Sequence, residues 1–380
     1  MPWFMTSDYR QAIAQGQQAL QARDHARAAE LLRDAAASAP AQDMAWVPLA
    51  NAELALGRND AAEVAIDAEL LLRPRAVGAL LLKGYLREAA SDARAASSFY
   101  RAAINQAALD GAVPPALSAL HAHAGRYIGA ANQQFEAYLL DAVGSDLSPN
   151  MTEAIELLTG KRELYLQEPS VFYYPGLPQQ RFYDPAEFPW LEPMLALVPQ
   201  MQAELAAVLG EGAKGFDPYV HRKQHRPAPN TPLLDSQDWT AFHFWRDGLR
   251  DETNAARCPV TMEALSHAPL PQIPGRSPNA HWSRLLPGAH IAPHTGMLNT
   301  RLICHVPILT APQCWLRVGS ETRGWVDGVP LVFDDSIQHE AKNDGSQERV
   351  ILLFEIWRPE IGAADREAIG RIFQAIGTYE

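Results

Sequence analysis

The chain has 380 residues, 47% of them hydrophobic and 20% charged, which indicates a globular protein of about two or three domains. The formal net charge of -12 argues against a general nucleic-acid or membrane-surface binder, because both need a cationic face. Three scattered cysteines favour free thiols in a reducing compartment, and the sequence contains no leader and no run of about 18 apolar residues. We therefore expect a cytoplasmic protein without a membrane segment.

Helix-forming residues with apolar positions at a 3.6-residue period predict helices over the first 110 residues. The helices repeat at 34 residues, with small residues where paired helices cross and proline where a unit ends. These recurring positions are Ala28, Ala62 and Ala96; Gly16, Ala50 and Gly84; and Pro40 and Pro74. The pattern resembles about three units of the tetratricopeptide repeat (TPR), the alternative being a generic alanine-rich bundle.

A further helical stretch, roughly residues 115–143, is expected to cap the array, because a solenoid needs a terminal unit with a polar outer face. We predict a TPR-like helical repeat domain over residues 1–145 and a linker over residues 146–164. An array of this kind presents a concave surface, so we expect a protein partner or self-association there.

The middle of the chain is less regular. Residues 168–190 are dense in proline and aromatic residues and are expected to wrap on the surface of a second domain. A helix follows over residues 190–210 and ends at Gly210. The basic segment 221–226 is interpreted as a solvated charged loop.

From about residue 278 onward, short apolar strands alternate with turns. The strand-like segments are "HWSRLL", "RLICHVPI", "CWLRVG", "PLVFDD" and "ERVILLFEIW". This texture predicts a jelly-roll or cupin-like barrel, a fold that binds ligands at one mouth. The whole chain is thus predicted to be an α+β multidomain protein: a TPR-like α-helical solenoid followed by a double-stranded β-helix domain.

Histidines gather in the stretch "GAHIAPHTGMLNTRLICHVPI", at His290, His294 and His305. Proline and glycine exclude a helix there, so the spacing of four between His290 and His294 is not a helical metal pair. Isolated strand histidines are commonly hydrogen-bonded structural residues, which is our expectation for His281 and His290. His339 precedes Arg349 by ten residues, a relation that fits an iron site holding a dicarboxylate.

Several segments together resemble the aspartyl/asparaginyl β-hydroxylase family of 2-oxoglutarate-dependent oxygenases. They are "WSRLLPGAHIAPHTGMLNTRLICHVPI", "SETRGWVDGVPLVFDDSIQHEA", "ERVILLFEIWRPE" and, ahead of the barrel, "FHFWRDGLRDETNAARCPVTMEAL". The resemblance covers roughly residues 165–362, and it implies an oxygenase domain over residues 165–380. Members of the family bind Fe(II) with two histidines and no carboxylate, and here Gly296 stands where a carboxylate is usual.

The resemblance also implies roles for individual residues. His294 and His339 match the iron ligands, and Asp335 would orient an iron-bound water. Arg349 and Ser283 match the residues that bind the distal carboxylate of 2-oxoglutarate. His305 matches the histidine near its other carboxylate, and Arg301 matches a basic residue that lines the substrate side.

The chain departs from the family at Ile303, where the pattern has an arginine that pairs with the carboxylate at the keto-acid end. Losing a charge-assisted hydrogen bond weakens cosubstrate binding by about 1.5–3 kcal/mol unless another group replaces it.

The expected activity is hydroxylation of an unactivated C–H bond with Fe(II), 2-oxoglutarate and O2. The resemblance implies the β-carbon of an Asp/Asn-type residue in a peptide or protein, or a related small molecule. An iron halogenase or an acyl-chain hydroxylase using the same two histidines stays an alternative. A TPR scaffold with a catalytically inert cupin-like module is the alternative from another class.

Overall fold

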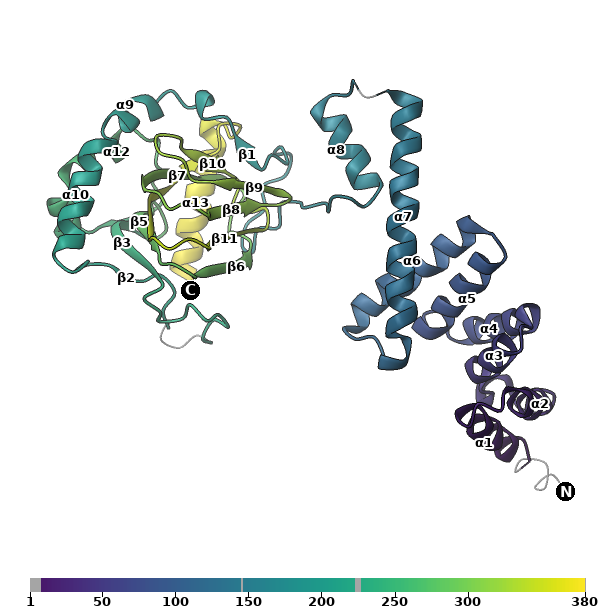
Figure 1. Ribbon diagram of the computed structural model, residues 1–380. Helices are drawn as coiled ribbons and strands as arrows, with labels where there is room; N and C mark the ends of the chain where they lie inside the picture. The colour runs from purple at the N-terminus through teal and green to yellow at the C-terminus, as the bar shows by residue number, and fades with distance from the viewer. Residues whose placement is uncertain (1–7, 145, 223–226, 380) are drawn as a thin grey trace. The chain divides into compact units, whose positions relative to one another are not determined.

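The computed structural model describes residues 8–144, 146–222 and 227–379 (Figure 1). The chain divides into two compact units, Met1–Arg162 and Glu163–Glu380. Residues 223–226, which belong to the predicted charged loop, lie outside the described residues.

The first unit is helical. In chain order it contains α1 (Asp8–Gln21), α2 (His25–Ala36), η1 (Ala41–Asp43), α3 (Trp46–Ala55), α4 (Asn59–Leu72), α5 (Val77–Ala89), α6 (Ala93–Asp110), η2 (Pro115–Leu117), α7 (Ser118–Val143) and α8 (Pro149–Leu158). Helices α1 and α2, α3 and α4, and α5 and α6 pack as successive pairs, and each pair also contacts the next. This is the predicted TPR-like solenoid.

Small residues let the paired helices approach closely. Ala28, Ala62 and Ala96, the alanines that recur at the repeat period, are completely buried. A Cβ atom added at Gly16 would lie 2.6 Å from Cγ of Leu32 on the partner helix, so a larger residue does not fit there. The repeat pattern therefore reflects steric requirements at the helix crossings.

Part of the predicted linker is helical. Helix α8 occupies residues 149–158, and the Ser148 side chain caps its N-terminus by accepting a hydrogen bond from the Met151 backbone N–H at 3.3 Å. The boundaries of the two domains remain a prediction. None of the described helices is long and apolar enough to cross a membrane.

The second unit combines two antiparallel sheets with short helices. Its strands are β1 (Phe182–Tyr183), β2 (Asp217–Pro218), β3 (Trp239–Arg246), β4 (Leu249–Arg250), β5 (Ala280–Leu285), β6 (His290–His294), β7 (Arg301–Leu309), β8 (Cys314–Val318), β9 (Glu321–Gly324), β10 (Leu331–Phe333), β11 (His339–Asn343) and β12 (Arg349–Trp357). Its helices are η3 (Pro185–Glu187), α9 (Leu191–Ala196), α10 (Val198–Gly210), α11 (Glu252–Arg257), α12 (Pro259–Ser266) and α13 (Ala363–Tyr379). The major sheet has the order β1-β10-β7-β12-β5-β3-β2, with β4 beside β3, and the minor sheet has the order β6-β11-β8-β9.

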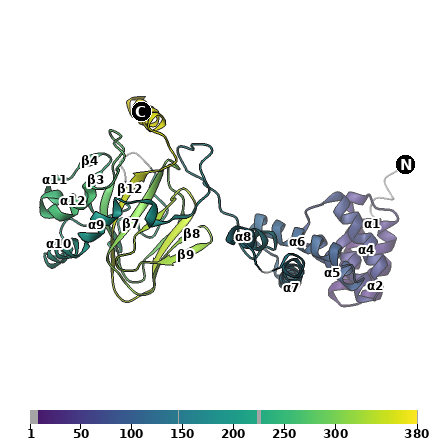
Figure 2. The same cartoon turned by 90° about the horizontal axis from the view of Figure 1, so that it is seen from above.

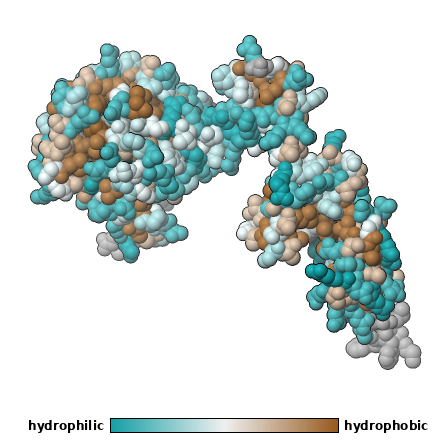
Figure 3. All heavy atoms as spheres, in the orientation of Figure 1, coloured by the Kyte–Doolittle hydropathy of each residue, from teal (hydrophilic) through white to brown (hydrophobic). Residues whose placement is uncertain are grey.

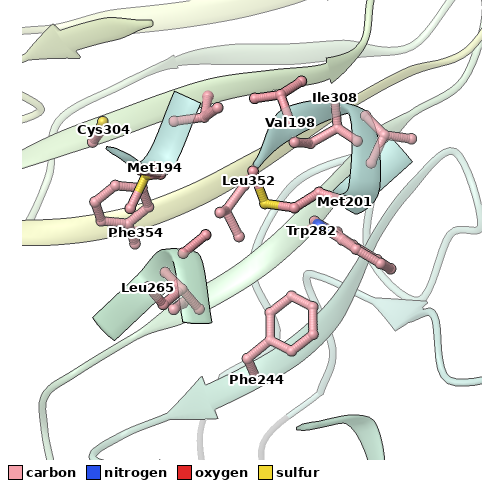
Figure 4. Packing of buried hydrophobic residues seen from close by; sticks show 14 of the residues in the cluster. Met194, Val198, Met201, Phe244, Leu265, Trp282, Cys304, Ile308, Leu352 and Phe354 are labelled. Carbon is pink, nitrogen blue, oxygen red and sulfur yellow. The ribbon is translucent and has the colours of Figure 1, made fainter. Parts of the chain in front are cut away.

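The two faces of the major sheet have different partners. Helices α9, α10 and α12 cover the outer face (Figures 1 and 2). Figure 4 shows Met194, Val198 and Met201 of α9 and α10 packed with Trp282 and Leu352 of the sheet. The inner face packs against the minor sheet, because apolar residues of both sheets form one buried cluster. This arrangement is the predicted double-stranded β-helix.

The sheet begins earlier than the sequence indicates. Strand β3 (residues 239–246) belongs to the major sheet and pairs with β5, although the prediction started the barrel near residue 278. Residues 321–324 and 339–343, which lie outside the predicted strand-like segments, form β9 and β11. These short strands contain several polar or charged residues, so they lack the apolar alternation that identifies strands from sequence.

The two faces of each strand alternate, so residues two apart project to the same side. On β12, Arg349, Ile351, Leu353 and Glu355 form one such set, and they face the minor sheet because Ile351 belongs to the inner cluster. Their register partners on β5 are Leu285 for Arg349, Ser283 for Ile351 and His281 for Leu353. The sheet thus collects polar residues from several strands on one inner wall.

Apolar residues form patches between hydrophilic areas on the surface of the molecule (Figure 3). On the helical unit, exposed large apolar side chains include Val64, Leu71, Tyr85, Phe135 and Tyr138.

The close packing of α5 on α6 gives a prediction about stability. A Cβ atom at Gly84 would overlap the ring of Tyr100, so Gly84→Ala should lower the free energy of unfolding of the helical unit by about 1–3 kcal/mol. The control is Gly125→Ala on α7, where nothing lies within 4 Å of the added Cβ, and this change should stabilise by about 0.5–1 kcal/mol. Urea unfolding followed by circular dichroism compares the two variants. Equal effects of both substitutions would contradict the assignment of Gly84 to a steric crossing point.

Candidate active site

A cavity of about 680 Å³ lies between the two sheets of the second unit, with side chains from both sheets in its wall. All seven residues singled out in the sequence line it: Ser283, His294, Arg301, His305, Asp335, His339 and Arg349. His290, expected to be structural, lies 2.8 Å from the Glu340 carboxylate through its Nε2 atom and is partly exposed. The sheets therefore gather the candidate residues and leave His290 outside their set.

His294 and His339 lie next to each other at the ends of β6 and β11, where they are register partners with ring centroids 4.1 Å apart. Their Nδ1 atoms lie 2.8 and 3.1 Å from the carbonyl oxygens of Ala292 and Ile337, respectively. Because a carbonyl oxygen only accepts, each Nδ1 carries a proton, and in the neutral form of the ring Nε2 then keeps a lone pair. Burial, and next His294, lower the pKa of His339 to about 3, so its imidazole is neutral near pH 7. Two neutral imidazoles side by side can hold a divalent metal ion.

Gly296 lies two residues after His294, and the space beside it is filled. A Cβ atom there would overlap the carboxyl group of Asp335. The Gly296 backbone N–H also donates to the Asp335 carbonyl oxygen at 2.6 Å, which holds the two segments together. The sequence shows only that a carboxylate is absent at residue 296, whereas the structure shows that the carboxyl group of Asp335 occupies the neighbouring space.

Asp335 is tied to a buried arginine. Its Oδ2 atom accepts from Nη2 of Arg301 at 3.0 Å, while Oδ1 is buried with no hydrogen-bond partner among the described residues. Burial raises the pKa of Asp335, and the Arg301 guanidinium opposes that rise. Arg301 also donates to Glu355. Burial alone would lower the pKa of Arg301, but the two carboxyl groups outweigh it and hold that pKa above its ordinary value. Arg301 lines the cavity as predicted, but its guanidinium is already engaged by two carboxyl groups.

Arg349, unlike Arg301, is not engaged by a carboxyl group among the described residues. Its side chain is 1% exposed, and its Nε and Nη2 atoms have no hydrogen-bond partner among the described residues. The guanidinium carbon lies 4.7 Å from the ring centroid of Trp325, and burial lowers the Arg349 pKa to about 10. Nearby Ser283 accepts a hydrogen bond from Trp239 Nε1 at 3.1 Å, which leaves the hydroxyl proton free to donate. This part of the wall is built to receive an anion.

His305 presents a single donor to the cavity. Trp325 Nε1 lies 3.4 Å from His305 Nδ1, and because an indole N–H only donates, Nδ1 acts as the acceptor. The proton is then on Nε2, which is buried without a partner among the described residues. Burial, and next the charge of Arg349, hold the pKa of His305 well below its usual range. His305 can therefore donate one hydrogen bond to an anion that Arg349 attracts.

Ile303 is 7% exposed and packs in the inner apolar cluster. Its register partners are Phe333 on β10 and Glu355 on β12, so neither neighbour supplies a positive charge. Among the described lining residues, the arginines are Arg246, Arg301 and Arg349. No cation takes the place of the family arginine in this part of the described wall.

Three further histidines line the cavity, His221, His243 and His281, and the sequence interpretation assigned none of them to the site. His243 on β3 lay in a segment placed ahead of the barrel, and His281 was expected to be a hydrogen-bonded structural residue. That expectation for His281 is wrong, because neither of its ring nitrogens has a hydrogen-bond partner among the described residues. One signal was available: His281 lies two residues before Ser283 on one strand, so both side chains face the same side.

Comparison with known proteins shows what the second unit is similar to. Residues 197–359 match the aspartyl/asparaginyl β-hydroxylase family. The human protein named aspartyl/asparaginyl β-hydroxylase is 30% identical over 205 residues, which are 53% of this chain and 26% of that protein. Aspartate β-hydroxylase domain-containing protein 2 of Xenopus tropicalis is 31% identical over 215 residues, 55% of each chain. The predicted resemblance is confirmed, and the chain spans about a quarter to half the length of these relatives.

Solved structures similar to parts of this chain include a TPR domain of Sgt2 from Aspergillus fumigatus. It is 21% identical, with a TM-score of 0.30, and the alignment covers 35% of this chain and 88% of that one.

The contact between Gly296 and Asp335 gives a prediction about coupling. Gly296→Ala should lower the free energy of unfolding by about 1–3 kcal/mol, because the new methyl group overlaps the Asp335 carboxyl group. In an Asp335→Ala background the same substitution should cost less, so the two changes are non-additive. The control is Gly324→Ala, whose nearest contact is an ordinary 3.6 Å and whose effect should stay within about 0.5 kcal/mol. Additive effects of the first two substitutions in urea unfolding would refute the contact.

Proposed function

We propose that the second unit is a hydroxylase that uses Fe(II), 2-oxoglutarate and O2 to hydroxylate an unactivated C–H bond. The observation that carries the proposal is the buried guanidinium of Arg349, two of whose nitrogens have no hydrogen-bond partner in the described part of the chain, in a cavity that also holds His294 and His339. Leaving a charged group buried without a partner is unfavourable, so the site is expected to receive an anion. Membership of the β-hydroxylase family supports the reaction class.

The residues present fit the iron ion. In His294 and His339 the Nδ1 protons are held by backbone carbonyls, so in the neutral ring Nε2 carries the lone pair that can bind a metal ion. Imidazole suits Fe(II), and the two ligands add no negative charge. A dianionic cosubstrate would then balance the charge of the ion. The carboxyl group of Asp335 would accept a hydrogen bond from a metal-bound water.

The residues also fit 2-oxoglutarate. Arg349 would bind the distal carboxylate with the two nitrogens that have no partner, and the Ser283 hydroxyl would add one hydrogen bond. The Nε2–H of His305 would donate to the carboxylate at the keto-acid end, where the apolar Ile303 adds nothing. Bound together, iron, 2-oxoglutarate and O2 supply the oxidation that inserts one oxygen atom into the C–H bond and releases succinate and CO2.

The substrate proposed from the family is an Asp/Asn-type residue in a peptide or protein, or a related small molecule. Arg301 lines this side of the cavity, where it orients Asp335 and Glu355. For an iron halogenase, chloride would be expected beside Gly296, and the carboxyl group of Asp335 in that space argues against an anion there. An acyl-chain substrate stays an alternative, because apolar residues such as Leu233, Ile291 and Met297 line the cavity beside the polar ones.

The helical unit is proposed to bind a protein partner or a second copy of the chain, as TPR-like arrays present extended surfaces. A catalytically inert barrel beside such a scaffold is the competing proposal. An inert core would gain nothing from a buried arginine without an anion, so Arg349 favours the enzyme. The three cysteines, all buried free thiols, support the proposed cytoplasmic location.

Loss of either histidine should remove the metal. His294→Ala and His339→Ala should each lower Mn(II) affinity by at least about tenfold and abolish succinate formation from 2-oxoglutarate, because one imidazole remains. His290→Ala is the control, since His290 is paired with Glu340 and was not assigned to the metal. Isothermal titration with Mn(II) and a succinate assay give the two readouts. Turnover that survives both substitutions would refute the assignment of the ligands.

Removal of the Arg349 charge should weaken binding of the cosubstrate. Arg349→Met should weaken 2-oxoglutarate binding by about 10–100-fold, the effect of losing charge-assisted hydrogen bonds worth about 1.5–3 kcal/mol. Mn(II) affinity should change little, because Arg349 is not proposed as a ligand. The control is Arg323→Met, whose guanidinium lies over Phe182 and pairs with Glu321. Unchanged 2-oxoglutarate affinity in Arg349→Met would contradict the proposed anion site.

A further inference from the structure

His243 and His281 form a pair on the inner wall of the cavity. They are register partners on β3 and β5, and their ring centroids lie 5.1 Å apart. The same register row continues through Leu353 on β12 to His305 on β7. The pair is therefore on the inner wall that carries the cosubstrate residues. His281 is on the same strand as Ser283, and His243 is on the neighbouring strand β3.

Most of the hydrogen-bonding capacity of this pair is unused among the described residues, although the Trp245 backbone interacts with His243. His281 is 2% exposed and neither ring nitrogen has a partner, and Nδ1 of His243 is also buried without one, among the described residues. In His294, His339 and His305, by contrast, one ring nitrogen has a protein partner. Buried polar atoms of this kind are normally satisfied, and leaving them unpaired costs about 1–3 kcal/mol each. A ligand that enters the cavity can satisfy them.

The described wall around the pair offers one positive charge for a substrate anion, Arg246, whose side chain is exposed to solvent and therefore contributes little. Burial, and next His243, hold the pKa of His281 well below its usual range, while burial and Arg246 lower that of His243 to about 4. Both imidazoles are thus neutral near pH 7. Of the lining arginines, Arg301 is engaged by two carboxyl groups and Arg246 is exposed. Arg349 is proposed to hold the cosubstrate.

The chemistry of two neutral imidazoles selects the ligand. Each has one N–H donor and one acceptor nitrogen. A carboxylate has acceptors only, and its cationic partner in the described wall would be the solvent-exposed Arg246, which stabilises it little. An ammonium group has donors only, which leaves the imidazole donors unmatched. A carboxamide presents N–H donors and a carbonyl acceptor, so it complements the pair.

We propose that His243 and His281 bind a carboxamide of the substrate, so that the enzyme acts on an asparagine-type rather than an aspartate-type residue. This inference rests on the proposed function and goes beyond it by naming the group that is recognised. The two histidines are substrate-binding residues, and they have no part in holding iron or 2-oxoglutarate.

The test uses three peptide pools that are identical except for the central residue, which is Asn, Asp or Lys between randomised flanks. The full chain is supplied with Fe(II), 2-oxoglutarate and O2, and hydroxylated peptide is measured by mass spectrometry. The Asn pool should be hydroxylated with a kcat/KM at least about tenfold above both other pools, which corresponds to about 1.4 kcal/mol. Equal rates for Asn and Asp, or a preference for Asp or Lys, would overturn the inference.

Variants separate recognition from a structural role. His281→Leu should bring the ratio of the Asn rate to the Asp rate towards one, whereas His281→Gln, which keeps a donor and an acceptor, should retain most of it. His243→Lys adds a cation and should shift the ratio towards Asp. A purely structural role for His281 would lower all rates and leave the ratio unchanged, and that result would also overturn the inference. His290→Leu is the control that should leave the ratio as in the wild type.

Failure of the proposed function has a different signature. Anaerobic titration of the Fe(II)-loaded protein with 2-oxoglutarate measures cosubstrate binding without any peptide. If the cosubstrate binds and neither the Asn nor the Asp pool is hydroxylated, the carboxamide inference is overturned while the oxygenase proposal stands. If no cosubstrate binds and no succinate forms, the proposed function fails and the inference fails with it.

Discussion

A guanidinium buried without a carboxylate is the constraint on which the cavity depends. Arg349 rests against the ring of Trp325, and two of its nitrogens have no hydrogen-bond partner among the described residues. The same indole also orients His305 by donating to its Nδ1. One tryptophan thus positions both groups proposed to bind the cosubstrate. The minor sheet contributes the two histidines proposed as iron ligands, so the anion site and the metal site come together only when the two sheets pack.

Much of this could be predicted from the sequence, for physical reasons. The helical repeat was visible because close helix crossings require small residues, and Ala28, Ala62 and Ala96 are indeed completely buried. The site residues could be found because a strand shows alternate residues to one side, and Ser283 and Arg349 share the inner face. The resemblance to the hydroxylase family added their expected roles, which remain predictions.

Other features depend on contacts that sequence does not display. Arg301 was expected to be a basic residue on the substrate side, but it pairs with Asp335 and Glu355, which are 34 and 54 residues away. The overlap of Gly296 with the Asp335 carboxyl group likewise depends on packing between distant segments. The sequence shows His281 as an ordinary strand histidine, whereas in the structure neither of its ring nitrogens has a partner among the residues described. In each case the deciding fact is a partner, or the lack of one, in three dimensions.

The central claim is that two histidines and one buried arginine hold iron and 2-oxoglutarate in this cavity. An anaerobic crystal structure of the chain with Fe(II) and 2-oxoglutarate tests it most directly. The account predicts that Nε2 of His294 and Nε2 of His339 ligate the ion, with the distal carboxylate of 2-oxoglutarate on Arg349 and Ser283. Iron bound elsewhere, Asp335 as a direct ligand, or a cosubstrate that leaves Arg349 unpaired would contradict it.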